Sequence, residues 1–145
     1  TSFHEILVVP SKRGRYLLVL AEYGNVRQIR GEGYRRWFTD EYFDLIVWFD
    51  RPPGNQATLT GFQLCYDRNG YERALTWTLT RGYSHERIDA GEGTPGSPKA
   101  TPILVADGIF DGASVRERFR EASAGIDRFI ADLVLEKLAE YPKPI

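Results

Sequence analysis

Histidine and cysteine, the side chains most used for metal binding and nucleophilic catalysis, are scarce in this chain. Its 145 residues contain two histidines, His4 and His85, and one cysteine, Cys65. Zinc sites draw three or four ligands largely from these residue types, and the G-x-S-x-G pattern of many serine hydrolases is also absent. We therefore expect no metal ion and no cofactor, and we assign no catalytic residue from a motif.

The segment His85–Asp89 superficially matches the zinc-protease pattern H-E-x-x-H, with Asp in the place of the second His. That motif works on a helix, which brings positions i and i+4 onto one side. Gly82 and Gly91 flank the segment closely, and Ile88 is its only aliphatic residue. We therefore predict that it is not a metal site and that His85 is exposed to solvent on a strand or loop.

Apolar runs separated by turn residues indicate an antiparallel sheet. Gly24-Asn25, Pro52–Asn55 and Asn69-Gly70 each lie between two such runs, which is the pattern of hairpins. Segment 34–41 is ambiguous and is compatible with a short helical turn, and 83–89 is an uncertain strand. The predicted strands are 3–9, 15–22, 26–30, 42–50, 57–67, 71–81 and 102–106.

An amphipathic helix is predicted at the C-terminal end. Ser114 and Glu117 form a capping-box pattern, in which each side chain satisfies a backbone N–H at the helix start. Apolar residues then recur at spacings of three and four over 115–140, and Pro142 prevents continuation. Gly125 interrupts this stripe, and because glycine is a poor helix former we expect a bend or a close packing contact there.

Together these elements predict one α+β domain over residues 1–145. Its antiparallel β-sheet is expected to have about six or seven strands in meander order. We expect this sheet to be curved or partly barrelled and to pack against the long C-terminal amphipathic helix.

Composition excludes several classes of protein. Aromatic residues make up 13% of the chain and the formal net charge is −1, so that intrinsic disorder is not expected. The longest apolar runs, such as 45–49, are far shorter than the roughly 20 residues of a membrane span. A single cysteine forms no internal disulfide, and the N-terminal residues resemble no signal sequence, so that we expect a cytoplasmic protein without a membrane partner.

Turn type sets the register of the second central hairpin. Asn69-Gly70 predicts a two-residue type I′ turn. Counting outward from that turn places Leu64 opposite Leu75 and Phe62 opposite Trp77, with all four side chains on one face.

The first central hairpin is predicted to extend the same face. A six-residue loop over 51–56 places Leu45 opposite Phe62 and Phe43 opposite Leu64. We expect the C-terminal helix to cover the wholly apolar face that results. Its predicted members are Phe43, Leu45, Val47, Phe49, Phe62, Leu64, Leu75, Trp77 and Leu79.

The opposite face of these strands mixes aromatic, hydroxyl, amide and carboxyl groups. A surface on which a few polar groups can orient a largely apolar molecule is typical of a ligand site. The alternative is a half-buried face beneath the N-terminal strands, in which Asp44 bonds to Arg or Thr neighbours. The predicted ligand-binding residues are Tyr42, Asp44, Trp48, Gln63, Thr76 and Thr78, with His85 at their edge.

Three classes of function fit these patterns. The leading hypothesis is a non-catalytic module that binds a small-molecule ligand or another protein through the mixed face. The second is an enzyme in which Asp44 or His85 acts as acid–base on a small apolar substrate. Exposed aromatic residues in 34–49 could in addition form the contact of a homodimer.

Segment 12–37 suggests the third class, nucleic-acid binding. It holds seven basic residues, interleaved with aromatic ones, and that composition suits phosphate contacts and base stacking. The whole chain is slightly acidic, whereas nucleic-acid-binding domains are generally basic. We therefore do not expect nucleic acid to be the partner.

Overall fold

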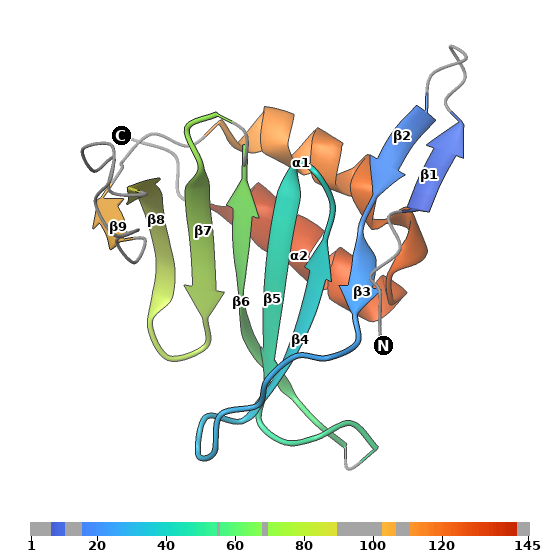
Figure 1. Cartoon of the computed structure of the whole chain (residues 1–145). Coiled ribbons are helices and arrows are strands. Elements are labelled where there is room, and N and C mark those ends of the chain that lie inside the picture. Colours follow the sequence, from blue (N-terminus) through green and yellow to red (C-terminus); the bar gives the residue numbers. More distant parts are fainter. Residues whose placement is uncertain are drawn as a thin grey trace, which may run out of the picture.

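A sheet of seven antiparallel strands dominates the structure. The structure is a computed structural model, and it describes residues 7–10, 16–54, 56–67, 70–89, 103–106 and 111–141. Each strand pairs with its neighbours in sequence, as the meander prediction required (Figure 1). The two outermost strands do not pair with each other within the described residues, so the sheet is open and not barrelled. In spatial order the strands are β3 (Ala21–Tyr23), β4 (Tyr34–Thr39), β5 (Phe43–Phe49), β6 (Leu59–Tyr66), β7 (Arg73–Thr78), β8 (Gly82–Asp89) and β9 (Ile103–Ala106).

A separate hairpin precedes the sheet. Strands β1 (Leu7–Pro10) and β2 (Tyr16–Val19) pair only with each other among the described strands. The hairpin lies near the β3 edge, and β2 contacts the first C-terminal helix (Figure 1). The predicted strand over 26–30 is wrong, because these residues form the loop between β3 and β4, and the ambiguous segment 34–41 contains a strand and no helical turn.

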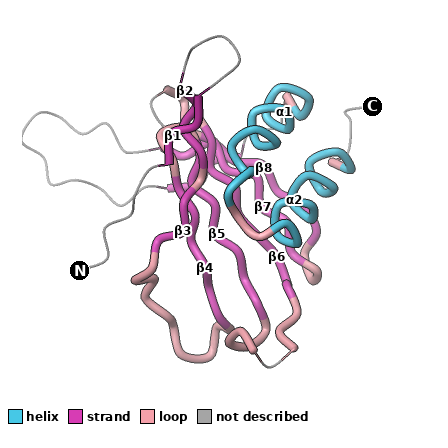
Figure 2. The backbone as a smooth tube through the Cα atoms, turned by 90° about the vertical axis from the view of Figure 1, so that its right-hand side faces the viewer, coloured by secondary structure: helices cyan, strands magenta, loops and turns pink. Residues whose placement is uncertain are grey.

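Two helices cover one face of the sheet, where a single helix was predicted. They are α1 (Gly112–Ala122) and α2 (Arg128–Glu140), and the 3₁₀ turn η1 (Ser123–Gly125) connects them (Figure 2). The helix breaks where Gly125 was expected to bend it, and Ile126 has an extended backbone. The predicted cap is also wrong, since the carboxylate of Asp111, and not Ser114, caps the first helix by accepting from the Ser114 N–H.

Strict alternation along β5 separates the two faces of the sheet. Phe43, Leu45 and Val47 are at most 1% exposed, whereas the residues between them are half-buried. The apolar face was therefore predicted correctly, with one exception: β7 ends at Thr78, and Leu79 beyond it is 61% exposed. Buried residues of the helices that complete this core are Val115, Phe119, Ala122, Ile130, Ala131, Val134 and Leu138.

The register of β6 and β7 agrees with the prediction. Leu64 pairs with Leu75 and Phe62 with Trp77. Beyond the last pair, Tyr66 with Arg73, the Gly70 N–H donates to the carbonyl of Asp67. Arg68 and Asn69, on which the predicted two-residue turn depends, lie outside the described residues.

The register of β5 and β6 is shifted by two residues from the prediction. Leu45 pairs with Leu64 rather than with Phe62, and Phe43 pairs with Tyr66. The loop is longer than six residues, since the Asp50 carboxylate accepts from the Thr58 N–H and closes it at that point. A shift of two leaves every side chain on its predicted face, because the side-chain period of a strand is two.

Gly61 allows β6 and β7 to approach closely next to a β-bulge. Trp48 pairs with Gly61 and Phe49 with Leu59, so that one extra residue lies on β6. A Cβ atom added at Gly61 would lie 2.6 Å from the Trp77 carbonyl oxygen. A methyl group at this position is excluded unless the two strands separate.

We predict that Gly61→Ala lowers the free energy of unfolding by about 1–3 kcal/mol, because the methyl group forces a backbone shift. Urea unfolding followed by circular dichroism measures this change. The control is Gly82→Asn, since Gly82 has a φ of +69° with open space around it and asparagine tolerates that backbone. Equal stability of the wild type and Gly61→Ala would contradict the close approach.

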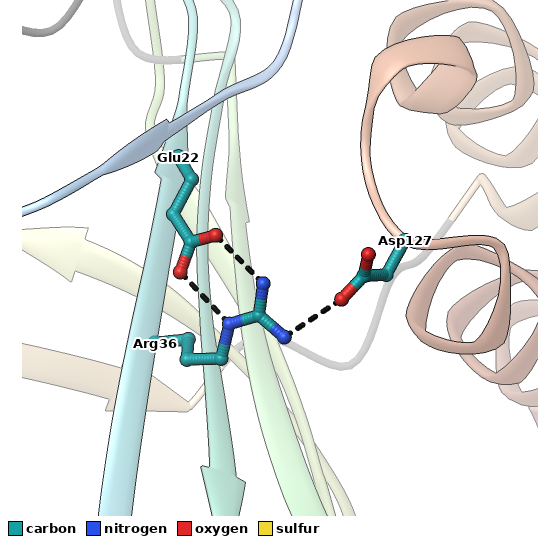
Figure 3. A network of polar contacts seen from close by, with 3 residues as sticks. All are labelled: Glu22, Arg36 and Asp127. Carbon is teal, nitrogen blue, oxygen red and sulfur yellow. Dashed lines mark hydrogen bonds and ion pairs between the residues drawn. The ribbon is translucent and has the colours of Figure 1, made fainter. Parts of the chain in front are cut away.

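One arginine connects the sheet to the helices. The Arg36 guanidinium donates to both carboxylate oxygens of Glu22 on β3, at 2.6 and 2.8 Å, and to Asp127 at 2.8 Å (Figure 3). Asp127 is the N-cap of α2, but its carboxylate makes no capping bond and binds the arginine instead. The hydrogen bonds that Arg36 donates to Glu22 raise the pKa of Arg36 above its usual value; burial opposes this rise and the bond to Asp127 adds to it. We call this group the Arg36 network.

We predict that Arg36→Gln lowers the free energy of unfolding by about 1–2 kcal/mol, because both carboxylates lose a charged partner and one of them is well exposed to water. Arg120→Gln is the matched control, since that arginine pairs with Glu117 on the surface of one helix. Equal effects of the two substitutions in urea unfolding would show that the Arg36 network adds nothing to an ordinary surface ion pair.

Candidate functional site

The face of the sheet turned away from the helices carries most of the predicted site. Residues directly opposite each other in an antiparallel pair point to the same side, so the register defines this surface, which we call the outer face. No helix or strand among the described residues lies over it (Figure 2). It includes Tyr23, Arg35, Trp37, Asp44, Ile46, Trp48, Gln63, Cys65, Thr76, Thr78 and Glu86.

Five of the seven predicted site residues lie together on the outer face. Asp44 and Trp48 come from β5, Gln63 from β6, and Thr76 and Thr78 from β7. All five side chains are half-buried. The predicted surface therefore exists with these members, although the register used to derive it was shifted by two residues.

Tyr42 does not belong to this surface. It precedes β5, in the turn after Asp40, and its ring packs edge-to-face on Phe43 at 4.7 Å. The Arg118 guanidinium of α1 lies 4.4 Å from the ring centroid, which places Tyr42 on the helix side. Burial raises the pKa of Tyr42, and the charge of Arg118 opposes that rise.

His85 is also on the helix side, and the prediction that it is exposed was wrong. It pairs with Leu75, which is fully buried, and is itself 6% exposed. Its Nε2 lies 2.6 Å from the Tyr66 hydroxyl oxygen, and the two rings stack with centroids 5.9 Å apart. The two groups considered for acid–base chemistry, Asp44 and His85, therefore lie on opposite sides of the sheet.

Trp37 lies on the outer face but was not predicted as a site residue. Its indole Nε1–H donates to a carboxylate oxygen of Asp44, and the Tyr23 ring packs edge-to-face on it at 4.9 Å. The alternative of a half-buried face gave Asp44 an Arg or Thr partner, and the donor is instead a tryptophan. Asp40 could have indicated that a strand containing Trp37 ends just before it. Its carboxylate accepts from the backbone N–H groups of Tyr42 and Phe43. Aspartate commonly holds a turn in this way, and here the turn separates β4 from β5.

Two hydrogen bonds hold polar side chains of the outer face. The Gln63 amide of β6 donates to the Thr76 hydroxyl of β7 at 3.0 Å, a cross-strand bond that orients both side chains. The Thr78 hydroxyl accepts from the Arg81 N–H at 3.0 Å in the turn that follows β7. The outer face is thus a layer of oriented polar groups beside two indole rings.

The basic and aromatic segment 12–37 is divided by the fold. Residues 12–15 lie outside the described part of the chain. Arg36 points to the helix side and is held by two carboxylates, while Arg35 lies on the outer face, where its guanidinium donates to the Arg27 carbonyl. The adjacent arginines of β4 therefore do not form one positive surface.

Neither a metal-binding cluster nor a membrane-spanning helix occurs among the described residues. No group of three or more His, Cys, Asp or Glu in the described part of the chain is arranged to hold a metal ion. None of the described helices is both long enough and apolar enough to span a membrane.

Comparisons with protein-family models, with curated proteins and with solved structures found no match to this chain.

We predict a coupling free energy of about 1 kcal/mol between Trp37 and Asp44 in a double-mutant cycle of Trp37→Phe and Asp44→Ala. The reason is that the indole N–H donates to a charged but partly hydrated acceptor. Urea unfolding of the four proteins gives the value. Trp37→Phe combined with Gln63→Ala serves as the control and should be additive, and a cycle at Asp44 that is equally additive would contradict the bond.

Proposed function

We propose that the protein is a non-catalytic binding module whose site is the outer face around Trp37, Asp44, Ile46 and Trp48. The observation that carries the proposal is the contrast between the two faces of one strand. On the helix side of β5 the side chains are essentially fully buried, whereas Ile46 and Trp48 on the outer face are half-buried. Partly buried apolar groups beside oriented polar groups are typical of a surface that a second molecule covers.

The ligand that suits this surface is small and largely apolar. Trp37 and Ile46 are direct cross-strand neighbours, and Trp48 follows Ile46 on the same side of β5. Indole rings supply large, rigid contact areas with a polar edge. The carboxyl of Asp44 and the amide of Gln63 flank this apolar centre and would orient the ligand.

Binding without catalysis is the simpler function for this arrangement. Asp44 and His85 cannot act together on one substrate, because the sheet separates them. The cross-strand neighbours of Asp44 are Thr39 and Cys65. An enzyme that used Asp44 alone would convert its ligand, so recovery of the ligand unchanged distinguishes the two hypotheses.

The test uses the indole N–H signals of ¹⁵N-labelled protein during titration with a panel of small neutral aromatic compounds. We expect at least one compound to shift the Trp37 and Trp48 signals saturably and to leave Trp77, which lies on the helix side, unchanged. Trp48→Thr should weaken that binding by about tenfold, since a buried ring contact is worth roughly 1–1.5 kcal/mol. Mass spectrometry should recover the compound unaltered.

Phe129→Ser is the matched control, because it removes an apolar side chain that is 63% exposed on α2. Shifts of Trp77 equal to those of Trp37 and Trp48, or no response to any compound, would contradict the proposal. Shifts that depend on protein concentration without any compound would assign the outer face to a homodimer instead.

A further inference from the structure

We infer that the outer face selects ligands that carry a positively charged amine, held by the Asp44 carboxylate. This inference rests on the proposed function and names the chemistry of its ligand.

Asp44 is a half-buried carboxylate with a neutral donor. One oxygen accepts from the Trp37 indole, and within the described residues Asp44 has neither a second hydrogen bond nor an ion pair. Asp40 shows the contrast: it is 4% exposed and takes two backbone N–H groups on one oxygen. A carboxylate that is partly removed from water gains most from a partner of opposite charge.

The nearest basic side chains of β4 are used elsewhere. Arg36 lies on the other side of the sheet in the Arg36 network, and Arg35 bonds to the Arg27 carbonyl. Arg35 also pairs with Trp48. Trp48 is four residues from Asp44 along β5, and at the rise of a strand this separates the two by about 13 Å. Neither arginine is therefore placed to neutralise Asp44.

A second carboxylate on this face is too distant to change the argument. Glu86 on β8 lies in the same cross-strand row as Asp44, through Cys65 and Ala74. Three strand spacings separate the two residues, about 14 Å, so that Glu86 is as far from Asp44 as Arg35 is. The selection of a cation therefore rests on Asp44 alone.

An organic cation fits better than a metal ion. A divalent metal requires several oxygen, nitrogen or sulfur ligands, and the described residues offer no such cluster. Trp37, Ile46 and Trp48 provide apolar contacts next to a single negative charge. A protonated amine on an aromatic or aliphatic body satisfies both features.

The experiment compares three probes of similar shape, which are 2-phenylethylamine, 2-phenylethanol and phenylacetate. At pH 7 they are a cation, a neutral molecule and an anion. We expect the amine to bind about tenfold more tightly than the alcohol, and the anion to bind most weakly, because a charge-assisted hydrogen bond is about twice as strong as a neutral one. The Trp37 indole N–H signal reports binding directly.

Asp44→Asn is the decisive variant, and it should reduce the affinity for the amine about tenfold and that for the alcohol much less, because the amide keeps hydrogen bonding and loses only the charge. Asp132→Asn is the matched control, since that carboxylate lies exposed on α2 and pairs with Arg128. A second measurement uses the wild type alone. Raising the salt concentration should weaken the binding of the amine and should not change the binding of the alcohol.

Equal affinity for amine and alcohol, with no effect of Asp44→Asn or salt, would overturn the selection of cations and leave the proposed binding function standing. No response of Trp37 and Trp48 to any of the three probes or to the neutral panel would overturn both. A preference for the amine that disappears in Asp132→Asn and persists in Asp44→Asn would place the cation elsewhere and overturn the assignment.

Discussion

The two-residue period of side chains along β5 is the constraint on which the rest of the structure depends. It gives the sheet one face of Phe43, Leu45 and Val47, which the helices bury, and one face of Asp44, Ile46 and Trp48, which they do not. Burial of the first face supplies most of the hydrophobic stabilisation. The second face is then determined, because no residue of a strand can change sides without moving its neighbours as well.

The Arg36 network adds a polar connection to the packing of the helices on the sheet. It ties β3 and β4 to the N-terminus of α2. The alternation of β4 places Arg36 on the helix side, opposite Val47, and the two carboxylates bind its charge there. The outer face holds Asp44 with an indole as its donor, and the same alternation that builds the core leaves this carboxylate open to an external cation.

The face of the sheet on which a side chain lies could be predicted from the sequence, even where the predicted strand register was wrong. The register of β5 and β6 was wrong by two residues, yet Asp44 and Gln63 remained on the predicted side. Tyr42 and His85 were misplaced for a different reason. Tyr42 lies in the turn held by Asp40, before the alternation of β5 begins at Phe43. The side of the sheet on which His85 lies depends on its pairing with Leu75. The Trp37–Asp44 bond joins residues only seven apart in sequence, but predicting it required recognising Tyr34–Thr39 as a strand paired with β5.

A crystal structure of the protein with 2-phenylethylamine would show whether Asp44 on the outer face binds the cation of a ligand. We expect the ammonium nitrogen about 2.8 Å from an Asp44 carboxylate oxygen, with the phenyl ring against Ile46 or Trp48 and the Trp37 indole still donating to Asp44. An amine bound on the helix side of the sheet, or on the outer face with its nitrogen away from Asp44, would contradict this expectation.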